Sequence, residues 1–344
     1  MPESYDLLAN YLKDCYTTVK DYCDEHGGVE NLDGDAVNAL QSVNFTDGKA
    51  PDYRHKVIRD WYHIRYLYAY AYEYRQIYRR LLKDQEPPVM KILSIGCGDG
   101  IDYWAAWEAR RMLMQETEKH IEYTGLDLAD WDRKWGVGDL TLPDASNTSY
   151  FIGDAVRYLK QVPVLEQNIF VFPKSISEFP DEVFDRLCEL FAGARFQFEE
   201  RKGSLVNTPK VHFLVSYRSD GRSSKDGPPD MERTRSLAKK MEETGAFSLV
   251  PGWDKVYTWR DDCSEGGAPK GNSWAYIDRL DRGIGFDEVD RLFYSAPDVK
   301  EFLKKLTGKG KNADGSFDNP YDIKRVVRLA DYISYQILTF VRKE

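Results

Sequence analysis

Apolar residues recur about every 3.6 positions along the first part of the chain. They do so in PESYDLLANYLKDCYTTVKDYCDEH, which spans residues 2–26, and a pair of prolines follows at 87–88. This period places the apolar side chains on one face of a helix, and a double proline interrupts helices. The pattern therefore predicts an N-terminal helical lobe over residues 1–88.

Part of this lobe is rich in tyrosine, namely DWYHIRYLYAYAYEYRQIYRRLL at residues 60–82. The alternation of tyrosines from 66 to 74 also suits a strand, but the segment is long and its Arg, Ala, Leu, Glu and Gln residues favour a helix. In a helix, one stripe holds Tyr62, Tyr66, Tyr70, Tyr74 and Tyr78. We expect most of these rings to pack within the lobe, with one or two left to line a ligand pocket.

A second pattern begins at residue 89, where short apolar runs alternate with segments of helical period. This alternation is typical of crossover units that build a mostly parallel sheet. We expect strands at 91–95, 121–127, 149–152, 168–172 and 210–217. We expect helices near 101–119, 154–161, 181–193 and 230–244. Residues 89–262 are thus predicted to form an α/β core.

The core is expected to end in a β-hairpin, since FSLV at 247–250 and DKVYTW at 254–259 are separated by PGW. Residues 263–344 exceed what such a core requires, so we expect a C-terminal extension. It contains the glycine-rich stretch 264–273, a predicted helix near 297–306 and a predicted amphipathic helix at 319–344.

Composition is ordinary for a soluble globular protein, with 42% hydrophobic and 31% charged residues among 344. No apolar run is long enough to span a bilayer, and the first residues carry acid rather than base, so we expect a cytoplasmic protein with no membrane partner. The net charge of -9 disfavours the broad basic surface that non-specific nucleic-acid binding needs. Nucleic acid is therefore not an expected partner.

The five cysteines are odd in number and far apart, which suggests neither a disulfide framework nor a four-cysteine zinc site. Cys23 and His26 have a ligand-like gap without a second pair of matching spacing. Residues 310–321 look like a calcium loop, but Gly310 and Tyr321 stand where carboxylates are needed, so a polar surface loop is favoured. We therefore expect reduced thiols and no metal site.

Three glycines mark the end of the first expected strand in ILSIGCGDGIDYW, residues 92–104. Gly96, Gly98 and Gly100 leave the backbone bare, so that N–H groups could approach a nucleoside ligand, or they could simply form a tight structural turn. A nicotinamide site would need a third glycine where Ile101 stands, and a phosphate loop would need a Gly-Lys-Ser/Thr ending. The observed spacing is G-x-G-x-G.

This spacing after an apolar strand resembles the first motif of class I S-adenosylmethionine-dependent methyltransferases. The resemblance covers about residues 90–260 and implies a Rossmann-like fold with a mostly parallel seven-stranded sheet and a terminal β-hairpin. It also implies S-adenosyl-L-methionine as the cofactor. The residues implied to hold it in this turn are Gly96, Cys97, Gly98, Asp99 and Gly100. Ser94 departs from the family, which often has an acid at that position.

Two further strand ends carry acids that the resemblance assigns to the cofactor. Asp127, followed by Leu128, is implied to bind the two ribose hydroxyls, and a carboxylate offers two acceptor oxygens to two donors. Asp154 is implied to accept the adenine amine, and Ala155 to donate its backbone N–H to the ring. Each acid could instead cap the helix that follows it.

The segment FVFPKSISEFPDEVF after the fourth expected strand is implied to lie beside the transferable methyl group. Pro173 would contact the cofactor, while Lys174, Ser175 and Glu178 are the candidate catalytic residues. Glu178 could act as base or amine anchor, or be a surface acid. Lys174 could bind an acidic substrate or lie over the sheet edge. The segment matches neither amino-directed nor cytosine-C5 DNA methyltransferases.

The resulting prediction is a methyltransferase that acts on a small molecule or a protein. Two alternatives remain open. One is another transferase that uses the same type of nucleoside, such as an aminopropyl transferase, and the other is a non-catalytic interaction protein with the same fold. The sequence predicts neither the acceptor nor the oligomeric state.

Overall fold

The computed structural model describes most of the chain, namely residues 4–44, 51–85, 89–113, 121–142, 147–162, 164–197, 210–217, 229–258, 274–275, 289–307, 327–328 and 334–343. The glycine-rich stretch 264–273, the loop 310–321 and the end of the helix expected at 101–119 lie outside these residues. None of the described helices is both long and apolar enough to span a membrane.

The chain divides into two compact units. One contains residues 1–72, 130–132 and 267–331, and the other contains residues 73–129, 133–266 and 332–344. The division falls inside α3, so this helix contributes to both units. The predicted division of the chain at residues 88 and 262 stays a prediction.

The first unit is mainly helical, as the periodicity predicts. Its α-helices are α1 (Ser4–Glu25), α2 (Gly34–Gln41), the first part of α3 (Lys56–Gln85) and α10 (Pro297–Thr307). Shorter elements are η1 (Val29–Asn31), η2 (Ser42–Asn44), η5 (Asp290–Tyr294), β10 (Trp274–Ala275) and β11 (Val327–Arg328), of which the two strands pair antiparallel. The tyrosine-rich segment is helical, and most of its tyrosines are buried. Tyr66 and Tyr70 stack with ring centroids 5.5 Å apart.

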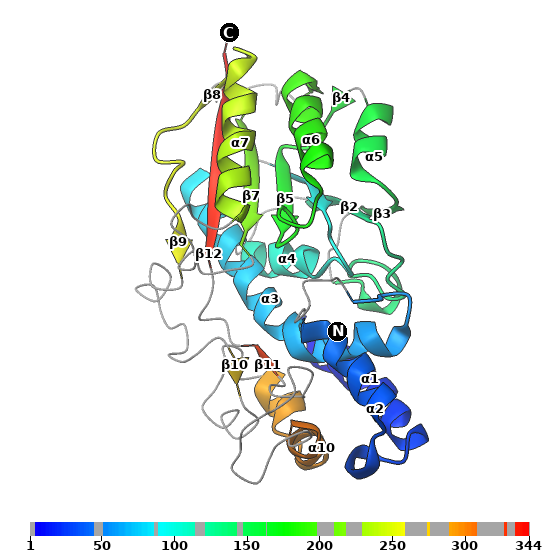
Figure 1. The fold of residues 1–344 in the computed structure, drawn as a ribbon. Coiled ribbons are helices and arrows are strands. Elements are labelled where there is room, and N and C mark those ends of the chain that lie inside the picture. Colours follow the sequence, from blue (N-terminus) through cyan, green and yellow to red (C-terminus); the bar gives the residue numbers. More distant parts are fainter. Residues whose placement is uncertain are drawn as a thin grey trace. The chain divides into compact units, whose positions relative to one another are not determined.

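The second unit is built on a sheet whose strands follow the order β3-β2-β1-β5-β7-β12-β8, with β9 paired to β12 (Figure 1). Its strands are β1 (Met90–Ile95), β2 (Ile121–Asp127), β3 (Thr148–Ile152), β5 (Ile169–Pro173), β7 (Lys210–Ser216), β8 (Phe247–Leu249), β9 (Tyr257–Thr258) and β12 (Ser334–Arg342). The first five in this order are parallel. The predicted fold class, a mostly parallel α/β sheet of Rossmann-like type, is confirmed.

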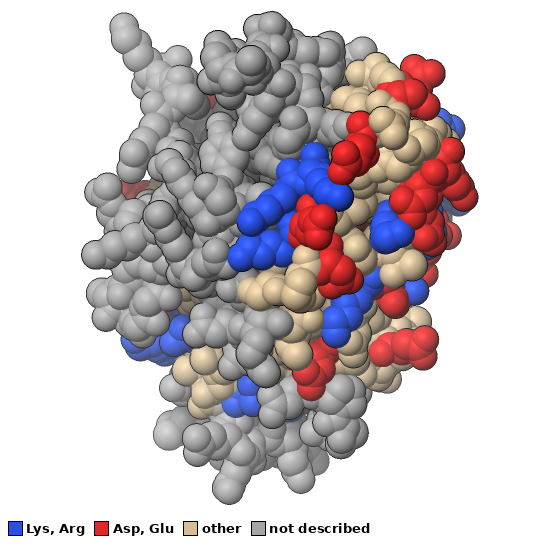
Figure 2. Space-filling view, turned by 90° about the horizontal axis from the view of Figure 1, so that it is seen from below, with Lys and Arg blue, Asp and Glu red and all other residues tan. Residues whose placement is uncertain are grey.

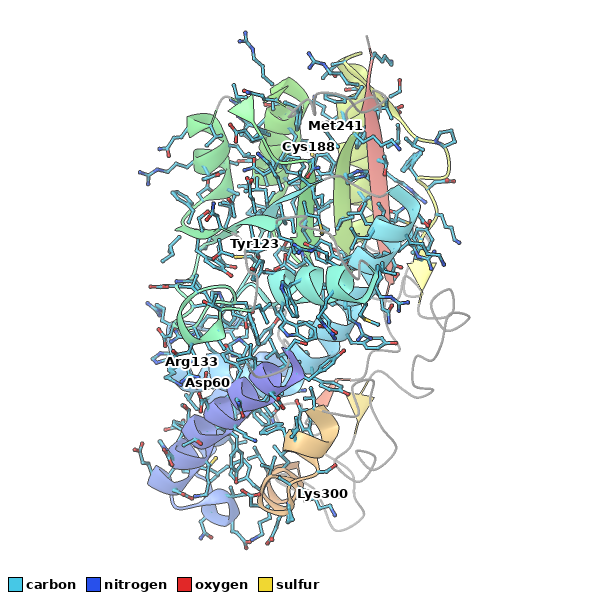
Figure 3. The ribbon with its side chains drawn as sticks, turned by 180° about the vertical axis from the view of Figure 1, so that it is seen from behind. Asp60, Tyr123, Arg133, Cys188, Met241 and Lys300 are labelled. Carbon is cyan, nitrogen blue, oxygen red and sulfur yellow. The ribbon has the colours of Figure 1, made fainter. Side chains whose placement is uncertain are left out.

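Helices cover both faces of this sheet. The helices α5 (Ala155–Gln161), α6 (Asp181–Gly193) and α7 (Pro229–Glu243) lie on one face, and α4 (Ile101–Leu113) lies on the other (Figure 1). Between the sheet and the helices α5, α6 and α7 lies a core that includes Phe170, Phe191 and Phe213. Cys188 on α6 and Met241 on α7 belong to the same core (Figure 3). Three short elements also belong to this unit: β4 (Val164–Leu165), which pairs with β6 (Arg195–Phe196), and η3 (Gly138–Leu140).

The helix predicted at 319–344 is wrong wherever the structure describes it, because residues 327–328 form β11 and residues 334–342 form the strand β12. This strand runs antiparallel to β7 on one side and to β8 on the other. Its side chains are buried on both faces of the sheet, so the apolar residues do not alternate cleanly with polar ones. A mostly apolar segment without this alternation is easily mistaken for a helical pattern.

The predicted hairpin is also wrong. Residues 247–249 and 257–258 each pair with β12 and not with one another, so the C-terminal strand occupies the place expected for the second strand of the hairpin.

Figure 2 shows one face of the molecule, where acidic and basic side chains of the described residues lie interspersed.

Candidate functional site

The glycine turn follows β1 and has the left-handed backbone that the sequence pattern requires. The φ angles are 72° at Gly96, 59° at Gly98 and 82° at Gly100. L-residues with a Cβ rarely adopt this region, whereas glycine enters it without strain. At Gly96 a Cβ would also lie 2.5 Å from the Cβ of Ser175, so the turn after β1 contacts the turn after β5.

Tyr150 on β3 explains why two positions, one in the glycine turn and one on β2, must be glycine. A Cβ at Gly100 would overlap the Tyr150 hydroxyl, and a Cβ at Gly125 on β2 would lie 2.7 Å from the Tyr150 ring. The hydroxyl donates to the carbonyl oxygens of Trp135, at 2.5 Å, and Asp99, at 3.3 Å. The ring of Tyr150 therefore packs against the glycine turn and fixes its position from β3.

Asp127 joins the ends of β1 and β2. Its Oδ2 accepts a hydrogen bond from the Gly98 N–H at 2.8 Å, and its Oδ1 accepts from the Ala129 N–H at 2.9 Å. The residue is half-buried. A carboxylate oxygen has two lone pairs and can accept more than one hydrogen bond. Asp127 thus faces the glycine turn and orients one of its N–H groups.

Asp154 stands at the start of α5, after β3. Its side chain is exposed and accepts from the Arg157 N–H at 2.7 Å, so the residue is the N-cap of the helix. Ala155 is the first residue of α5, and the first N–H groups of a helix have no partner within it. The side chain of Leu128, also predicted to bind the cofactor, is 76% exposed.

Lys174 directly follows β5 and is held in an internal ion pair. Its Nζ lies 2.7 Å from Glu73 Oε1 and 2.6 Å from the Tyr217 carbonyl oxygen, and both charged side chains are buried. Glu73 Oε1 also accepts from the Ser216 hydroxyl at 2.6 Å. Lys174 has a φ of 60°, although it is not a glycine. These contacts hold the strand end in a strained conformation and occupy the ammonium group.

The other residues predicted after β5 differ in exposure. Pro173 is the last residue of β5 and is half-buried. Ser175 is buried and donates its hydroxyl to the Ile95 carbonyl at 2.5 Å, which ties the ends of β5 and β1 together. Glu178 is exposed, and its backbone N–H donates to the Ser175 carbonyl at 2.9 Å. Glu178 is therefore the candidate whose carboxylate is open to solvent.

A buried carboxylic acid lies beneath the glycine turn. Asp102, in the first turn of α4, is fully buried and accepts from the Tyr123 hydroxyl at 2.7 Å; Figure 3 labels Tyr123 on β2. Burial raises the pKa of Asp102 from 3.8 to about 6, although the hydrogen bond from Tyr123 opposes this shift. Burial, together with the nearby carboxylates, also holds the pKa of the Cys97 thiol well above its usual value. Cys97 is therefore a neutral thiol and not a nucleophile.

The order of the strands places these elements at one edge of the sheet. The chain runs outward from β1 through β2 to β3, and in the opposite direction from β5 to β7, so the order reverses between β1 and β5. In open α/β sheets, ligands bind outside the carboxyl ends of the strands at such a reversal. The glycine turn and the turn that contains Ser175 flank this position.

Sequence reasoning missed three parts of the site: Glu73, Tyr150 and Asp102. Asp102 had a local signal, since it opens the helix directly after the glycines. Tyr150 and Glu73 had none, because they meet the site only through the pairing of strands and the packing of α3. For the pair with the ligand-like gap, His26 Nδ1 lies 2.8 Å from the Tyr22 carbonyl, and burial raises the pKa of Cys23 to about 12.

No family model matches the chain, and no curated protein matches it either. Among solved structures, the plantazolicin methyltransferase BpumL in complex with SAH is 10% identical, over 90% of this chain and 97% of that one, with a TM-score of 0.39. A SAM dependent methyltransferase from Archaeoglobus fulgidus is 14% identical, over 78% and 94%, with a TM-score of 0.33.

A third similar structure is a cyclopropane-fatty-acyl-phospholipid synthase-like protein from Lactobacillus casei. It is 13% identical, over 88% of this chain and 98% of that one, with a TM-score of 0.35. At identities and TM-scores this low, the three proteins do not show which reaction this chain performs.

Proposed function

We propose that the protein is an S-adenosylmethionine-dependent methyltransferase whose cofactor lies across the carboxyl ends of β1, β2 and β3. The observation that carries the proposal is the contact between Asp127 Oδ2 and the Gly98 N–H, at 2.8 Å, beside the reversal of strand order. It puts a carboxylate, whose two oxygens are both acceptors, against the backbone of a glycine-rich turn. This combination suits a ribose with two adjacent hydroxyls.

Each end of the cofactor would have its own partners. Asp127 would accept from the ribose hydroxyls, and Asp154 with the Ala155 N–H would meet the adenine ring. The turn after β1 would leave room for the rest of the nucleoside; it contains Gly96, Cys97, Gly98 and Asp99. Asp154 can do this while it caps α5, because the cap uses Oδ1 and leaves Oδ2 for a second donor.

The turn after β5 would lie beside the reacting atoms. Bound S-adenosylmethionine supplies the methyl group, and the protein must align the acceptor with it. Glu178 is the residue proposed to anchor an amine or to take a proton from the acceptor. Lys174 and Ser175 have their polar atoms engaged, so we propose that they position this turn and do not react.

The acceptor would be a small molecule or a protein. Two other functions fit the same geometry: aminopropyl transfer from the decarboxylated nucleoside, and a binding role without catalysis. These alternatives differ in which nucleoside binds and whether it reacts, so a binding experiment separates them.

Titration calorimetry of the full chain with S-adenosylmethionine and S-adenosylhomocysteine tests the proposal. Each lost hydrogen bond to the carboxylate is worth about 1.5–3 kcal/mol, so Asp127→Ala should weaken binding by about tenfold or more. Asp139→Ala, which removes an exposed acid of the same unit, is the matched control. No binding by folded protein would refute the proposal, and preference for the decarboxylated nucleoside would favour aminopropyl transfer.

A further inference from the structure

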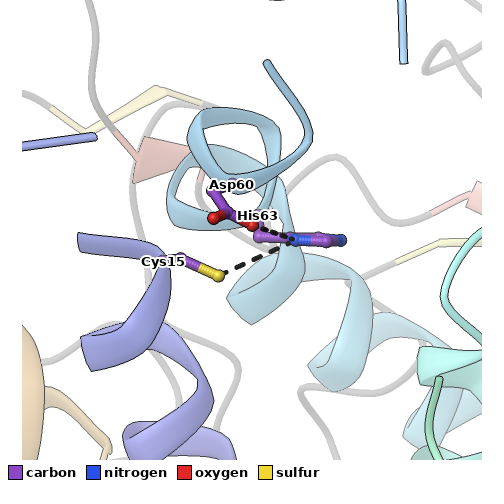
Figure 4. Close-up of side chains that lie close together, drawn as sticks. All are labelled: Cys15, Asp60 and His63. Carbon is purple, nitrogen blue, oxygen red and sulfur yellow. Dashed lines mark hydrogen bonds and ion pairs between the residues drawn. The ribbon is translucent and has the colours of Figure 1, made fainter. Parts of the chain in front are cut away.

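Three side chains that commonly bind metals meet inside the helical unit. Cys15 comes from α1, whereas Asp60 and His63 lie one turn apart on α3 (Figure 4). Their candidate ligand atoms all lie within 4.8 Å of one another, and all three residues are buried. Figure 3 labels Asp60 on α3, where this helix lies beside α1. A thiol, a carboxylate and an imidazole that converge in this way offer a cation three ligand atoms of different chemistry.

The distances fit a tetrahedral transition-metal site. Cys15 Sγ lies 3.8 Å from His63 Nδ1, and Asp60 Oδ1 lies 4.0 Å from the same nitrogen. Ligands about 2.0–2.3 Å from a tetrahedral Zn²⁺ are separated from one another by roughly 3.3–3.8 Å. The two distances to His63 Nδ1 would have to shorten by no more than a few tenths of an ångström. The separation of Cys15 from Asp60, which is within 4.8 Å, would have to shorten by up to about 1 Å, and side-chain rotations can supply both changes.

Neighbouring groups are arranged as the outer partners of metal ligands often are. Lys56 Nζ forms an ion pair with Asp60 Oδ2, which leaves Oδ1 toward His63. The Tyr11 hydroxyl lies 3.0 Å from His63 Nδ1 and could occupy a fourth position. The Trp131 ring lies 5.3 Å from the His63 ring and limits the access of water. Outer partners of this kind orient ligands and raise affinity.

We propose that Cys15, Asp60 and His63 form a binding site for a divalent transition metal of the zinc type. One thiolate and one carboxylate would balance the two charges of the ion, and the thiol proton would pass to solvent on binding. A thiolate and an imidazole disfavour Mg²⁺ and Ca²⁺, which prefer oxygen ligands. The ion would cross-link α1 and α3, whose ligands are 48 residues apart.

Cobalt substitution tests this site without any assay of activity. The full chain is reduced, stripped with a chelator and titrated with Co²⁺. We expect one equivalent to bind, with the intense visible absorption of tetrahedral Co²⁺ and a thiolate-to-cobalt charge-transfer band. Zn²⁺ should displace it, and Zn²⁺ at 100 times its Kd should favour the folded state by about 100-fold and raise the Tm.

Variants assign the signal to the three residues. Cys15→Ser should remove the charge-transfer band, and Asp60→Asn and His63→Gln should each weaken Co²⁺ binding by about tenfold or more. Cys23→Ser is the matched control, because Cys23 is a second buried cysteine of α1 outside the cluster; this variant should keep the band.

The Co²⁺ titration of the unmodified protein tests the proposal even if a variant does not fold. Absence of the two absorptions at stoichiometric Co²⁺ would overturn the proposal. So would a charge-transfer band that persists in folded Cys15→Ser protein. In either case the cluster is held by hydrogen bonds alone, among them the contact between Tyr11 and His63.

Discussion

Lys174 Nζ and Glu73 Oε1 lie 2.7 Å apart inside the second unit, although the two residues are separated by 101 positions in the sequence. Both side chains are buried, and each charge is the direct partner of the other. The pair ties the middle of α3 to the turn after β5, and this turn lies at the proposed site.

Removal of one partner of this pair should be costly. An uncompensated buried charge destabilises a protein by about 3–5 kcal/mol, so Glu73→Leu and Lys174→Met should each lower the free energy of unfolding by that order. The double variant should lose much less, since no charge is left alone. Urea unfolding of all three proteins measures the coupling. Glu166→Gln is the control, and equal losses in the double and single variants would contradict the prediction.

The glycine turn should not tolerate a methyl group. Gly100→Ala places a Cβ on the Tyr150 hydroxyl in a left-handed conformation, whereas Gly138→Ala has a φ of 62° but open space around it. Gly138→Ala should cost about 1–2 kcal/mol in the free energy of unfolding. Gly100→Ala should cost more and also weaken nucleoside binding. Similar losses in both variants would show that the contact with Tyr150 is unimportant.

Two substitutions separate the cap from the ligand contact at Asp154. Asp154→Ala removes the bond to the Arg157 N–H and should lower stability by about 1 kcal/mol. The serine of Asp154→Ser can still cap α5, so the stability of this variant should stay near that of the unmodified protein. Its side chain is shorter and should not reach the adenine ring. Its affinity for S-adenosylmethionine in calorimetry should nevertheless fall. Unchanged affinity in Asp154→Ser would leave the residue as a cap only.

Stability should depend on pH through Asp102. Its pKa is about 6 in the folded protein against 3.8 as the ordinary value, so the folded state holds a proton that the unfolded chain has released between these pH values. Stability therefore falls as pH rises from about 4 to 6, and the full effect is roughly 3 kcal/mol.

The variant Asp102→Asn should lack this fall, because its side chain does not titrate and still accepts from Tyr123. The difference in the free energy of unfolding between variant and unmodified protein should grow from about pH 4 to 6 and then level off. Asp139→Asn provides an exposed control. A difference that is constant with pH would contradict the raised pKa.

The parts of the fold that local sequence determines were predicted well. The five parallel strands, the helices between them and the glycine turn each carry their own pattern of apolar residues and turn formers. Asp127 was singled out by the resemblance to methyltransferases, and its place at the end of β2 follows from the apolar run before it. These features depend on short stretches of chain.

Features that depend on distant segments could not be predicted. The strand β12 is buried on both faces, so its apolar run lacks the alternation that identifies a strand. The partners of Lys174 and His63 follow from helix packing, and no spacing in the sequence brings Glu73 or Cys15 next to them. Spacing drew attention only to Cys23 and His26, where no metal site was expected, whereas Cys15, Asp60 and His63 are the residues that meet.

The position of β12 has a consequence for how the protein is made. On the ribosome, the first five strands can pair as soon as they emerge, but β8 has no neighbour until residues 334–342 have been synthesised. For that interval, of the order of several seconds or more, β7 presents an unpaired edge. Nascent chains of this protein should therefore expose the edge of β7 until residues 334–342 have been synthesised and have paired with it.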